Sequence, residues 1–445
     1  MLKKNLLLAI VAGTTALAAI GCDDDPSDPT PSGEAIDTLA GATGAKAIVV
    51  DPGDDNTIYI SGYYRISPGG SLEIPAGTTV IGLPIEETGQ HAAIIADRGD
   101  GTNPSGKLIA KGTASSPIVF TSKATTKARG QWGGIVLLGN STLNLDGNSG
   151  EIEGTGGSYG WGGSLSSAVT NDNSGTLEYV RIEFGGVPIT PDNEINGVTF
   201  GSVGSGTKVE HVQAHMIADD GFEWFGGTVN GKYLVSSGND DDAFDMDFGY
   251  SGNLQFLFAM QDPALANRGF EIDNNGSNNT ATPFTSATVS NVTIVGAGVD
   301  KTPSGEDNDG FYLRRGNRLK IWNAIATNFR YAMMIDGKAT SDHVQAGELF
   351  VKNSILHGRT GAYGSKSTEV ADYSTIAATW NNVLEDPMLR SIDFSSPDPR
   401  PNNPKAASIG SVPNNGYFDQ VSYAGAFDPS AGSLWFAGWT NWSKN

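Results

Sequence analysis

Residues 221–246 read GFEWFGGTVNGKYLVSSGNDDDAFDM, and this stretch decides the fold. It begins and ends with one pattern, a small residue followed by an apolar, an acidic and a second apolar residue. Because neighbouring residues of a strand point to opposite faces, each copy predicts a short strand whose two apolar side chains share one face. The first apolar residues of the two copies, Phe222 and Phe244, lie 22 residues apart, which indicates a structural repeat.

The repeat continues on both sides of this stretch. The pattern small–apolar–x–apolar has first apolar positions spaced 24, 22, 26, 41 and 22 residues apart, and its copies begin at Gly197, Gly221, Ala243, Gly269, Gly310 and Ala332. A second pattern, apolar–x–x–apolar–x–apolar or small, precedes most copies: Leu177/Val180/Ile182, Val209/Val212/Ala214, Leu254/Leu257/Ala259, Val289/Val292/Ile294 and Leu319/Trp322/Ala324. Two strand signals per coil are typical of a parallel β-solenoid, whose coils bury their apolar side chains by stacking. The 41-residue spacing predicts a long loop near residues 274–286.

Three earlier stretches have the same character: GSLEIPAGTTVIG (70–82), SGKLIAKGTASSPIVFTS (105–122) and QWGGIVLLGN (131–140). They resemble the early coils of right-handed parallel β-helix proteins of the pectin-lyase-like class, and the resemblance covers about residues 50–370. It implies an all-β fold with a right-handed parallel β-helix, which we expect over residues 46–375. It implies no particular activity, because many functions use one fold.

The segment from residue 376 to 445 differs from the repeats. Prolines interrupt it, and aromatic residues crowd its last thirty positions: Tyr417, Phe418, Tyr423, Phe427, Trp435, Phe436, Trp439 and Trp442. We expect an aromatic-rich C-terminal cap that covers the open end of the solenoid, where strand edges would otherwise be unpaired. A glycan-stacking surface and an export-recognition segment are the alternatives.

The first 21 residues predict a lipoprotein signal peptide. Lys3 and Lys4 precede an apolar run over residues 6–20 that is too short for an ordinary membrane-spanning helix. The sequence Ala-Ile-Gly-Cys at residues 19–22 resembles a bacterial lipobox, so we expect acylation of Cys22. The alternative is a plain secretory signal with a chance cysteine. Residues 22–45 are rich in acidic residues and proline near Cys22 and predict an extended tether.

These N-terminal features predict an exported protein, lipid-anchored to the bacterial cell envelope in the outer membrane, on either the surface or the periplasmic leaflet. Cys22 is the only cysteine of the 445 residues, so the fold has no internal disulfide bond. The formal net charge of −21 argues against nucleic acid as a partner and favours cations or neutral and cationic surfaces.

Three stretches carry a closer resemblance: ADDGFEWFGG (218–227), NDDDAFDMDFGYSGNLQFLFAMQ (239–261) and YAGAFDPSAGSLWFAGWT (423–440). They are similar to a group of bacterial envelope lipoproteins whose biochemical role is not known. Some of that group carry the label "multidrug transporter", for which this sequence gives no physical support. The resemblance implies an outer-membrane receptor as a partner, because such proteins tend to accompany receptors for nutrient uptake.

The acidic residues of the repeats fall into columns. With Phe222 and Phe244 pointing inward, Glu223, Asp245 and Glu271 are expected to point outward from three successive coils. Neighbouring positions and the turns before the strands complete a candidate cation- or ligand-binding face: Asp219, Asp220, Glu223, Asp241, Asp242, Asp245, Asp247, Glu271, Asp273 and Asp309.

Stacked strands lie about 4.8 Å apart, and two carboxylates at that separation repel by about 1 kcal/mol in water. A bound cation, a shared proton or arginine partners would offset this repulsion, and Arg268, Arg314 and Arg315 are available as partners. Oxygen ligands without cysteine or clustered histidine favour Ca²⁺ over zinc. Glu223, Asp245 and Glu271 are therefore the predicted metal ligands.

The alternative interpretation is structural. Aspartates are common in turns, where they accept backbone hydrogen bonds, so the face can consist of turn caps and a solvated surface. His211 and His215 share a strand face but have no third histidine nearby. Residues 151–163 predict a loop that flanks the acidic face.

Two function classes remain open from the sequence. The first is a non-enzymatic binding or scaffold protein that holds a glycan or a receptor partner, with Ca²⁺ as the cofactor. The second is a polysaccharide lyase or glycoside hydrolase that uses the acidic solenoid face with Arg268 or Arg314. No catalytic residue is assigned, because the sequence contains none of the tripeptides NTD, GHG and RIK that mark hydrolases of this fold.

Overall fold

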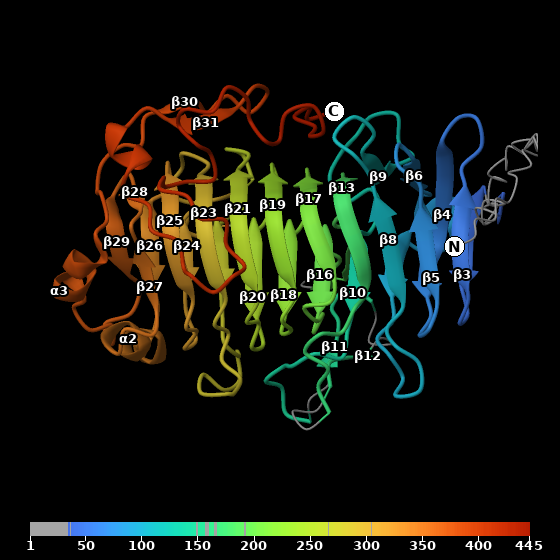
Figure 1. The fold of residues 1–445 in the computed structure, drawn as a ribbon, viewed down its shortest axis with the longest axis horizontal. Coiled ribbons are helices and arrows are strands. Elements are labelled where there is room, and N and C mark those ends of the chain that lie inside the picture. Colours follow the sequence, from blue (N-terminus) through green and yellow to red (C-terminus); the bar gives the residue numbers. More distant parts are fainter. Residues whose placement is uncertain are drawn as a thin grey trace, which may run out of the picture. The chain divides into compact units, whose positions relative to one another are not determined.

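Parallel strands stacked on one another form the main sheet of the structure, which is a computed structural model (Figure 1). It describes residues 34–35, 37–147, 150–155, 160–163, 167–190, 193–265, 267–303 and 305–445. The predicted signal peptide, Cys22 and residues 22–33 of the tether lie outside the described residues. Residues 33–445 belong to one compact unit.

The first coils are built from short strands paired in parallel. They are β1 (Glu34–Ala35), β2 (Thr38–Ala42), β3 (Ala47–Asp51), β4 (Thr57–Ile66), β5 (Ser71–Ile74), β6 (Thr79–Gly82), β7 (Ala93–Ala96), β8 (Lys107–Lys111), β9 (Ile118–Ser122) and β10 (Ile135–Leu138). Because β1 and β2 pair with β3 and β4, strand pairing begins before the expected boundary at residue 46.

Two parallel ladders form the later coils. The ladder that carries the small–apolar–x–apolar copies runs from β10 through β16 (Val198–Gly201), β18 (Phe222–Phe225), β20 (Phe244–Asp247), β22 (Phe270–Ile272), β24 (Phe311–Leu313) and β26 (Tyr331–Ile335) to β29 (Gly361–Ser365). The other ladder runs through β13 (Gly175–Glu183), β17 (Lys208–His215), β19 (Asn230–Ser237), β21 (Asn253–Met260), β23 (Thr288–Val295), β25 (Lys320–Thr327), β27 (Phe350–Lys352) and β28 (Ile355–His357).

Short antiparallel pairs and helices lie outside the ladders. The pairs are β11 (Gly150–Glu151) with β12 (Gly160–Trp161), β14 (Pro188–Thr190) with β15 (Asn193–Glu194), and β30 (Leu389–Ser391) with β31 (Asp398–Pro401). The helices are α1 (Ile85–Thr88), α2 (Lys338–Gln345), α3 (Ser374–Ala377), and the 3₁₀ turns η1 (Ala378–Trp380) and η2 (Pro404–Ala407). Among the described residues, no helix combines the length and the apolar character that crossing a membrane requires.

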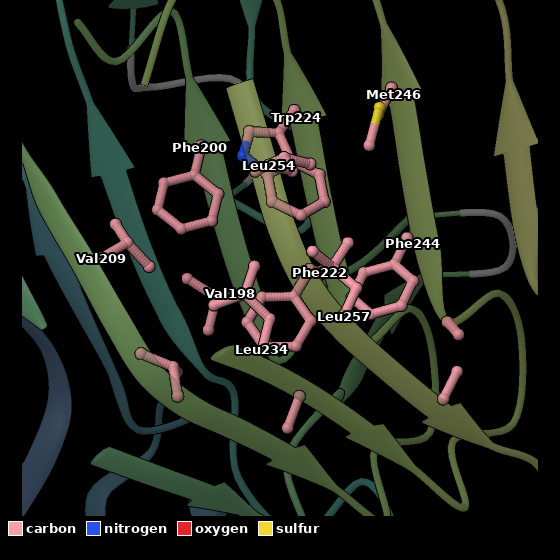
Figure 2. Close-up of a cluster of buried hydrophobic side chains, with 14 of the residues drawn as sticks. Val198, Phe200, Val209, Phe222, Trp224, Leu234, Phe244, Met246, Leu254 and Leu257 are labelled. Carbon is pink, nitrogen blue, oxygen red and sulfur yellow. The ribbon is translucent and has the colours of Figure 1, made fainter. Parts of the chain in front are cut away.

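The predicted inward face forms the core. Phe222 pairs with Phe244, and Phe244 pairs with Phe270, in the expected register. Their side chains are fully buried, and the ring centroids are 5.6 Å and 4.9 Å apart. Figure 2 shows the rings of Phe222 and Phe244 beside leucines of the other ladder, including Leu234 and Leu257. The all-β, parallel β-helix prediction is therefore confirmed.

Two details of the second pattern were wrong. Val289 pairs with Ile321, and Val292 pairs with Ala324. The last predicted set, Leu319/Trp322/Ala324, was therefore placed two residues too early. Trp322 pairs with Ser290 and lies on the other face of the strand. A copy in β19 was missed, because Gly231 occupies the first apolar position of the pattern, three residues before Leu234. The predicted long loop exists between β22 and β23, and a second loop between β23 and β24 supplies the rest of the 41-residue spacing.

Each long strand of the second ladder bends at a residue with positive φ. Tyr179, His211, Tyr233 and Phe256 have φ between 49° and 60° at equivalent places in successive coils. Their rings stack, with centroids 4.3 Å, 4.4 Å and 4.9 Å apart along the series. Mutual stacking in neighbouring coils gives these side chains contacts that offset the cost of the left-handed conformation.

The aromatic C-terminal segment lies along the flank of the second ladder, as the red ribbon in Figure 1 shows. Phe436 and Phe427 pack on Phe258 of β21, with ring centroids 5.6 Å and 5.3 Å away. The Gln213 side chain makes two hydrogen bonds to the backbone of Asn441, and Gln255 does the same with Asp419.

The expected cap over the last coil comes from an earlier part of the chain. Tyr373 and Trp380, in and beside α3 and η1, are buried in the main core cluster next to β27 and β29. The aromatic segment therefore covers the side of the strands, and residues 373–380 cover the terminal coil.

Candidate functional site

The acidic column forms as the repeat predicts. Glu223 pairs with Asp245, and Asp245 pairs with Glu271, in strands β18, β20 and β22. These side chains point away from the aromatic core because they alternate with it along each strand. Glu223 and Glu271 are nevertheless buried, at 6% and 7% exposed, and Asp245 is half-buried. A freely solvated face, one of the two expectations, is therefore wrong for Glu223 and Glu271.

Insertions between the strands cover the column. Glu153, from the loop after β11, accepts a hydrogen bond from the Nδ2 atom of Asn196 at 3.4 Å. Asn196 also donates to Glu223. The prediction that residues 151–163 contain a loop flanking the acidic face is confirmed at Glu153. Burial raises the pKa of both Glu153 and Glu223, and the neighbouring charge of Glu153 raises the pKa of Glu223 further.

Arginines neutralise one end of the column, which we call the arginine end (Glu271 and Asp273). Glu271 forms ion pairs with Arg268 and Arg314. Asp273 lies 2.7 Å from both Arg314 and Arg315. The ring centroid of Tyr312 lies 4.3 Å from the guanidinium of Arg268 and 5.4 Å from that of Arg314. Arginine partners, one of the three predicted offsets, are therefore present here.

The other end has no such partners, and we call it the carboxyl end (Asp219, Asp220, Glu223, Asp241 and Asp245). Within the described part of the chain, no lysine or arginine forms an ion pair with these five residues. Burial raises the pKa of Asp219, Asp220, Glu223 and Asp245 well above the usual carboxyl range, and neighbouring carboxylates raise it further.

Two aspartates of the turns also act as backbone caps. Asp220 accepts a hydrogen bond from the amide of Asp242 at 2.8 Å. Asp242 accepts one from the amide of Arg268, also at 2.8 Å. The side chain of each turn thus binds the next turn in the stack. The structural interpretation of these two residues is confirmed, and it does not exclude a second role for their free oxygens.

Carboxylate oxygens come within 4.8 Å of one another in three groups: Asp219–Asp220–Asp241, Asp220–Glu223–Asp245 and Asp242–Asp245–Glu271. The predicted ligands Glu223, Asp245 and Glu271 are thus divided between two groups, with Asp245 in both. Oxygens at this spacing can share one ion at about 2.4 Å from each. The Oδ1 atom of Asp245 is closed to solvent and has no hydrogen-bond partner.

The remaining candidates lie outside these groups. Asp247 accepts a hydrogen bond from the amide of Phe248, and burial raises its pKa. Asp309 is 1% exposed and forms an ion pair with Arg330 at 2.7 Å, so it has its own cationic partner.

The two histidines do not form a metal site. His211 stacks between Tyr179 and Tyr233, and burial lowers its pKa. His215 contacts Ser237 and the carbonyl of Ser443, and burial lowers its pKa to about 4.

A known protein family matches most of the chain. The family model of the pectate-lyase-like β-helix domain matches residues 45–386. The chain belongs to the pectate-lyase-like β-helix family. No curated protein and no solved structure matched the chain. Membership of the pectate-lyase-like β-helix family agrees with the two ladders and establishes the fold, and the activity has to be argued from the residues themselves.

Within this β-helix domain, the arginines of the acidic face act as ion-pair partners. Burial opposes the charged form of Arg268 and Arg314, yet the surrounding carboxylates hold the pKa of both above its ordinary value. A guanidinium in that state does not give up a proton. Neither residue is therefore suited to act as a catalytic base in this arrangement.

Proposed function

We propose that the protein is a lipid-anchored, non-enzymatic binding protein of the bacterial cell envelope, whose acidic face binds Ca²⁺ and, with it, a glycan or a receptor partner. One observation carries the proposal. Carboxylate oxygens of the carboxyl end approach one another within 4.8 Å, and ion pairs to lysine or arginine are confined to other residues of the described face. A divalent cation supplies the positive charge that this end lacks.

Physical chemistry favours Ca²⁺ among the candidate cations. The ligand atoms are carboxylate and amide oxygens, which are the ligands of hard cations. Ca²⁺ accepts six to eight oxygens in an irregular arrangement, whereas Mg²⁺ demands a near-ideal octahedron. Because protons occupy the same oxygens when the ion is absent, the affinity for Ca²⁺ should rise with pH.

Isothermal titration of the chelator-treated chain with CaCl₂ tests the cation. Binding that weakens from pH 8 to pH 5.5 supports the proposal, and a flat titration at both pH values would remove it. A glycan array with and without CaCl₂ then tests the second ligand. Signals that require CaCl₂ support a cation-dependent glycan site, and an array without signals leaves the receptor partner, which co-purification from envelope extracts tests.

The anchor is supported by the sequence alone. The basic residues Lys3 and Lys4, the apolar run and Cys22 have the order of a bacterial lipoprotein signal. Replacement of Cys22 by Ala should move the protein from the membrane fraction to the soluble fraction of cells. Persistence of Cys22→Ala in the membrane fraction would show that a partner, not a lipid, holds the protein there.

The enzymatic alternative has a direct assay. A polysaccharide lyase would produce an unsaturated-uronate absorbance from uronate-rich polymers, and a glycoside hydrolase would release reducing ends. Product formation that is lost in Asp245→Ala would replace the binding proposal with a catalytic one. We expect no product, because Arg268 and Arg314 are committed to ion pairs with Glu271 and Asp273.

A further inference from the structure

A cavity of about 330 Å³ opens beside the turns that precede β18, β20 and β22. Its described lining contains five acidic residues: Glu194, Asp219, Asp240, Asp241 and Glu306. None of the described lining residues is a lysine, arginine or histidine. The cavity is therefore the place on the carboxyl end where a solvated cation can reach the carboxylates.

Asn267 contributes the one buried amide of the cavity wall. Asn267 is 6% exposed, and its Nδ2 atom donates a hydrogen bond to Asp241 at 2.8 Å. That hydrogen bond fixes the orientation of the amide, because the opposite orientation would set its oxygen against a carboxylate oxygen. The Oδ1 atom of Asn267 is consequently left buried without a hydrogen-bond donor.

A buried amide oxygen without a donor is unfavourable, and few buried polar groups in folded proteins stay unpaired. No protein group within reach satisfies this oxygen in the described structure. The amide nitrogen contacts Asp241 and Asn267 lines the cavity, so the amide group stands at the cavity wall next to that carboxylate. A cation bound there would satisfy both the amide oxygen and the carboxylates.

We propose that this cavity is a Ca²⁺ site in which Asp219, Asp220 and Asp241 supply carboxylate oxygens and Asn267 supplies its amide oxygen. The assignment rests on the proposed cation binding and gives it a location. Oxygens of the three aspartates lie within 4.8 Å of one another, which suits an ion with oxygen ligands at about 2.4 Å. The ligands come from three successive turns, so the ion ties three coils together.

The site also explains a difference between equivalent turn positions. Asp219, Asp241 and Asn267 stand three residues before Phe222, Phe244 and Phe270, the first residues of their strands. Two carboxylates and one neutral amide at equivalent positions supply oxygen ligands with less mutual repulsion than three carboxylates would. Glu194 and Glu306 reach the same cavity from two insertions, so a bound ion lies where those insertions approach the turns.

The test uses the full chain, stripped of metal with a chelator and titrated with CaCl₂. Replacement of Asn267 by Ala should weaken Ca²⁺ binding about tenfold or more, since it removes one ligand of a site with few neutral oxygens. Asp219→Asn should weaken it at least as much. The matched control is Asn279→Ala, which removes an exposed amide outside the cavity and should leave the dissociation constant unchanged.

A second variant separates a ligand from a merely structural amide. Asn267→Asp adds a carboxylate opposite Asp241, so the melting temperature of the calcium-free variant should fall, and CaCl₂ should raise it by more than in the wild type. A structural role predicts a lower melting temperature for Asn267→Ala and Asn267→Asp alike, with no extra recovery on adding CaCl₂, and that result would overturn the assignment. Unchanged CaCl₂ affinity in Asn267→Ala and Asp219→Asn would also overturn it and leave cation binding elsewhere on the face intact. Absence of binding in the wild type would instead remove the proposed function.

Discussion

The two ends of the acidic column have the same strand pattern, but they differ in what offsets the repulsion between their carboxylates. At the arginine end, Glu271 and Asp273 share Arg268, Arg314 and Arg315. At the carboxyl end, Glu223 accepts a hydrogen bond from Asn196, which also donates to Glu153. One register position accounts for much of the difference, because Arg268 stands where earlier coils have Asp220 and Asp242.

The repeat therefore determines which side chains pack in the core, but it does not determine the charge of the turn residues. Apolar positions of successive coils must match, since their side chains pack on one another in the core. Turn positions outside the core carry no such requirement. A single substitution at a turn can therefore convert a neutralised coil into one that needs a proton or an added cation.

The largest expected effect tests whether both ends share one core. Phe244 lies in the core between the two ends and packs on both Phe222 and Phe270. Replacement of Phe244 by Ala should lower the free energy of unfolding by about 3–5 kcal/mol, because it opens a cavity in the stack. Urea denaturation with and without CaCl₂ measures it. The loss should be the same in both conditions, and a loss that CaCl₂ abolishes would contradict a shared core.

Removal of an arginine should be the next largest effect. Arg268→Met leaves Glu271, which is 7% exposed, without one of its two cationic partners, and should cost about 3 kcal/mol of unfolding free energy. The control is Arg359→Met, whose partner Asp300 is largely exposed, and it should cost less than about 1 kcal/mol. Equal effects of the two variants in urea denaturation would mean that burial does not distinguish the arginine end.

Calcium should affect the carboxyl end alone. At a free concentration one hundred times the dissociation constant, CaCl₂ should stabilise the wild type by about 2.7 kcal/mol. Asp241→Asn should reduce this gain, because Asp241 belongs to the carboxylate group of the proposed site. Asp309→Asn is the contrasting variant, since Asp309 is already paired with Arg330. Thermal unfolding in both conditions checks it, and an equal loss of the gain in both variants would contradict the distinction.

The smallest expected effect concerns pH. Burial raises the pKa of Glu223 in the folded chain, so the folded state binds more protons than the unfolded state above the usual carboxyl pKa. The stability that Glu223 contributes is fully present below the usual carboxyl pKa. It is lost as pH rises through the raised pKa of Glu223 in the folded chain. Without calcium, the wild type should therefore lose stability from acidic to neutral pH.

Replacement of Glu223 by Gln sharpens this prediction. The variant should stabilise the calcium-free protein at pH 8 by about 1 kcal/mol, through relief of like-charge repulsion. His215 contributes with the opposite sign, because burial lowers its pKa to about 4. The comparison of wild type and Glu223→Gln at each pH cancels that contribution, and parallel stability curves would refute the prediction.

The sequence was sufficient for the parts of the molecule that repeat. Phe222, Phe244 and Phe270 and the residues between them follow from strand alternation and spacing, and their pairing was predicted correctly. The pattern failed in β19, where glycine replaces the first apolar residue, so no strand was predicted there. Spacing thus predicts register only where each coil keeps its apolar side chains.

The surroundings of the acidic column could not be read from the repeat. Glu153 and Glu194 come from insertions whose paths are set by tertiary contacts, so no periodicity marks them. The unpaired oxygen of Asn267 depends on the side-chain geometry of Asp241, which no sequence pattern shows. The binding roles of the column remain predictions, whereas its existence and its burial are observed.

The C-terminal segment has a consequence for the order in which the chain can fold. Gln213 binds the backbone of Asn441, a partner 228 residues away in the chain. Until residue 441 has been made and released, the stacked rings of Tyr179, His211 and Tyr233 have no Trp435 or Trp439 against their edges. An unfinished chain therefore leaves the aromatic flank of the second ladder uncovered until its last residues are added.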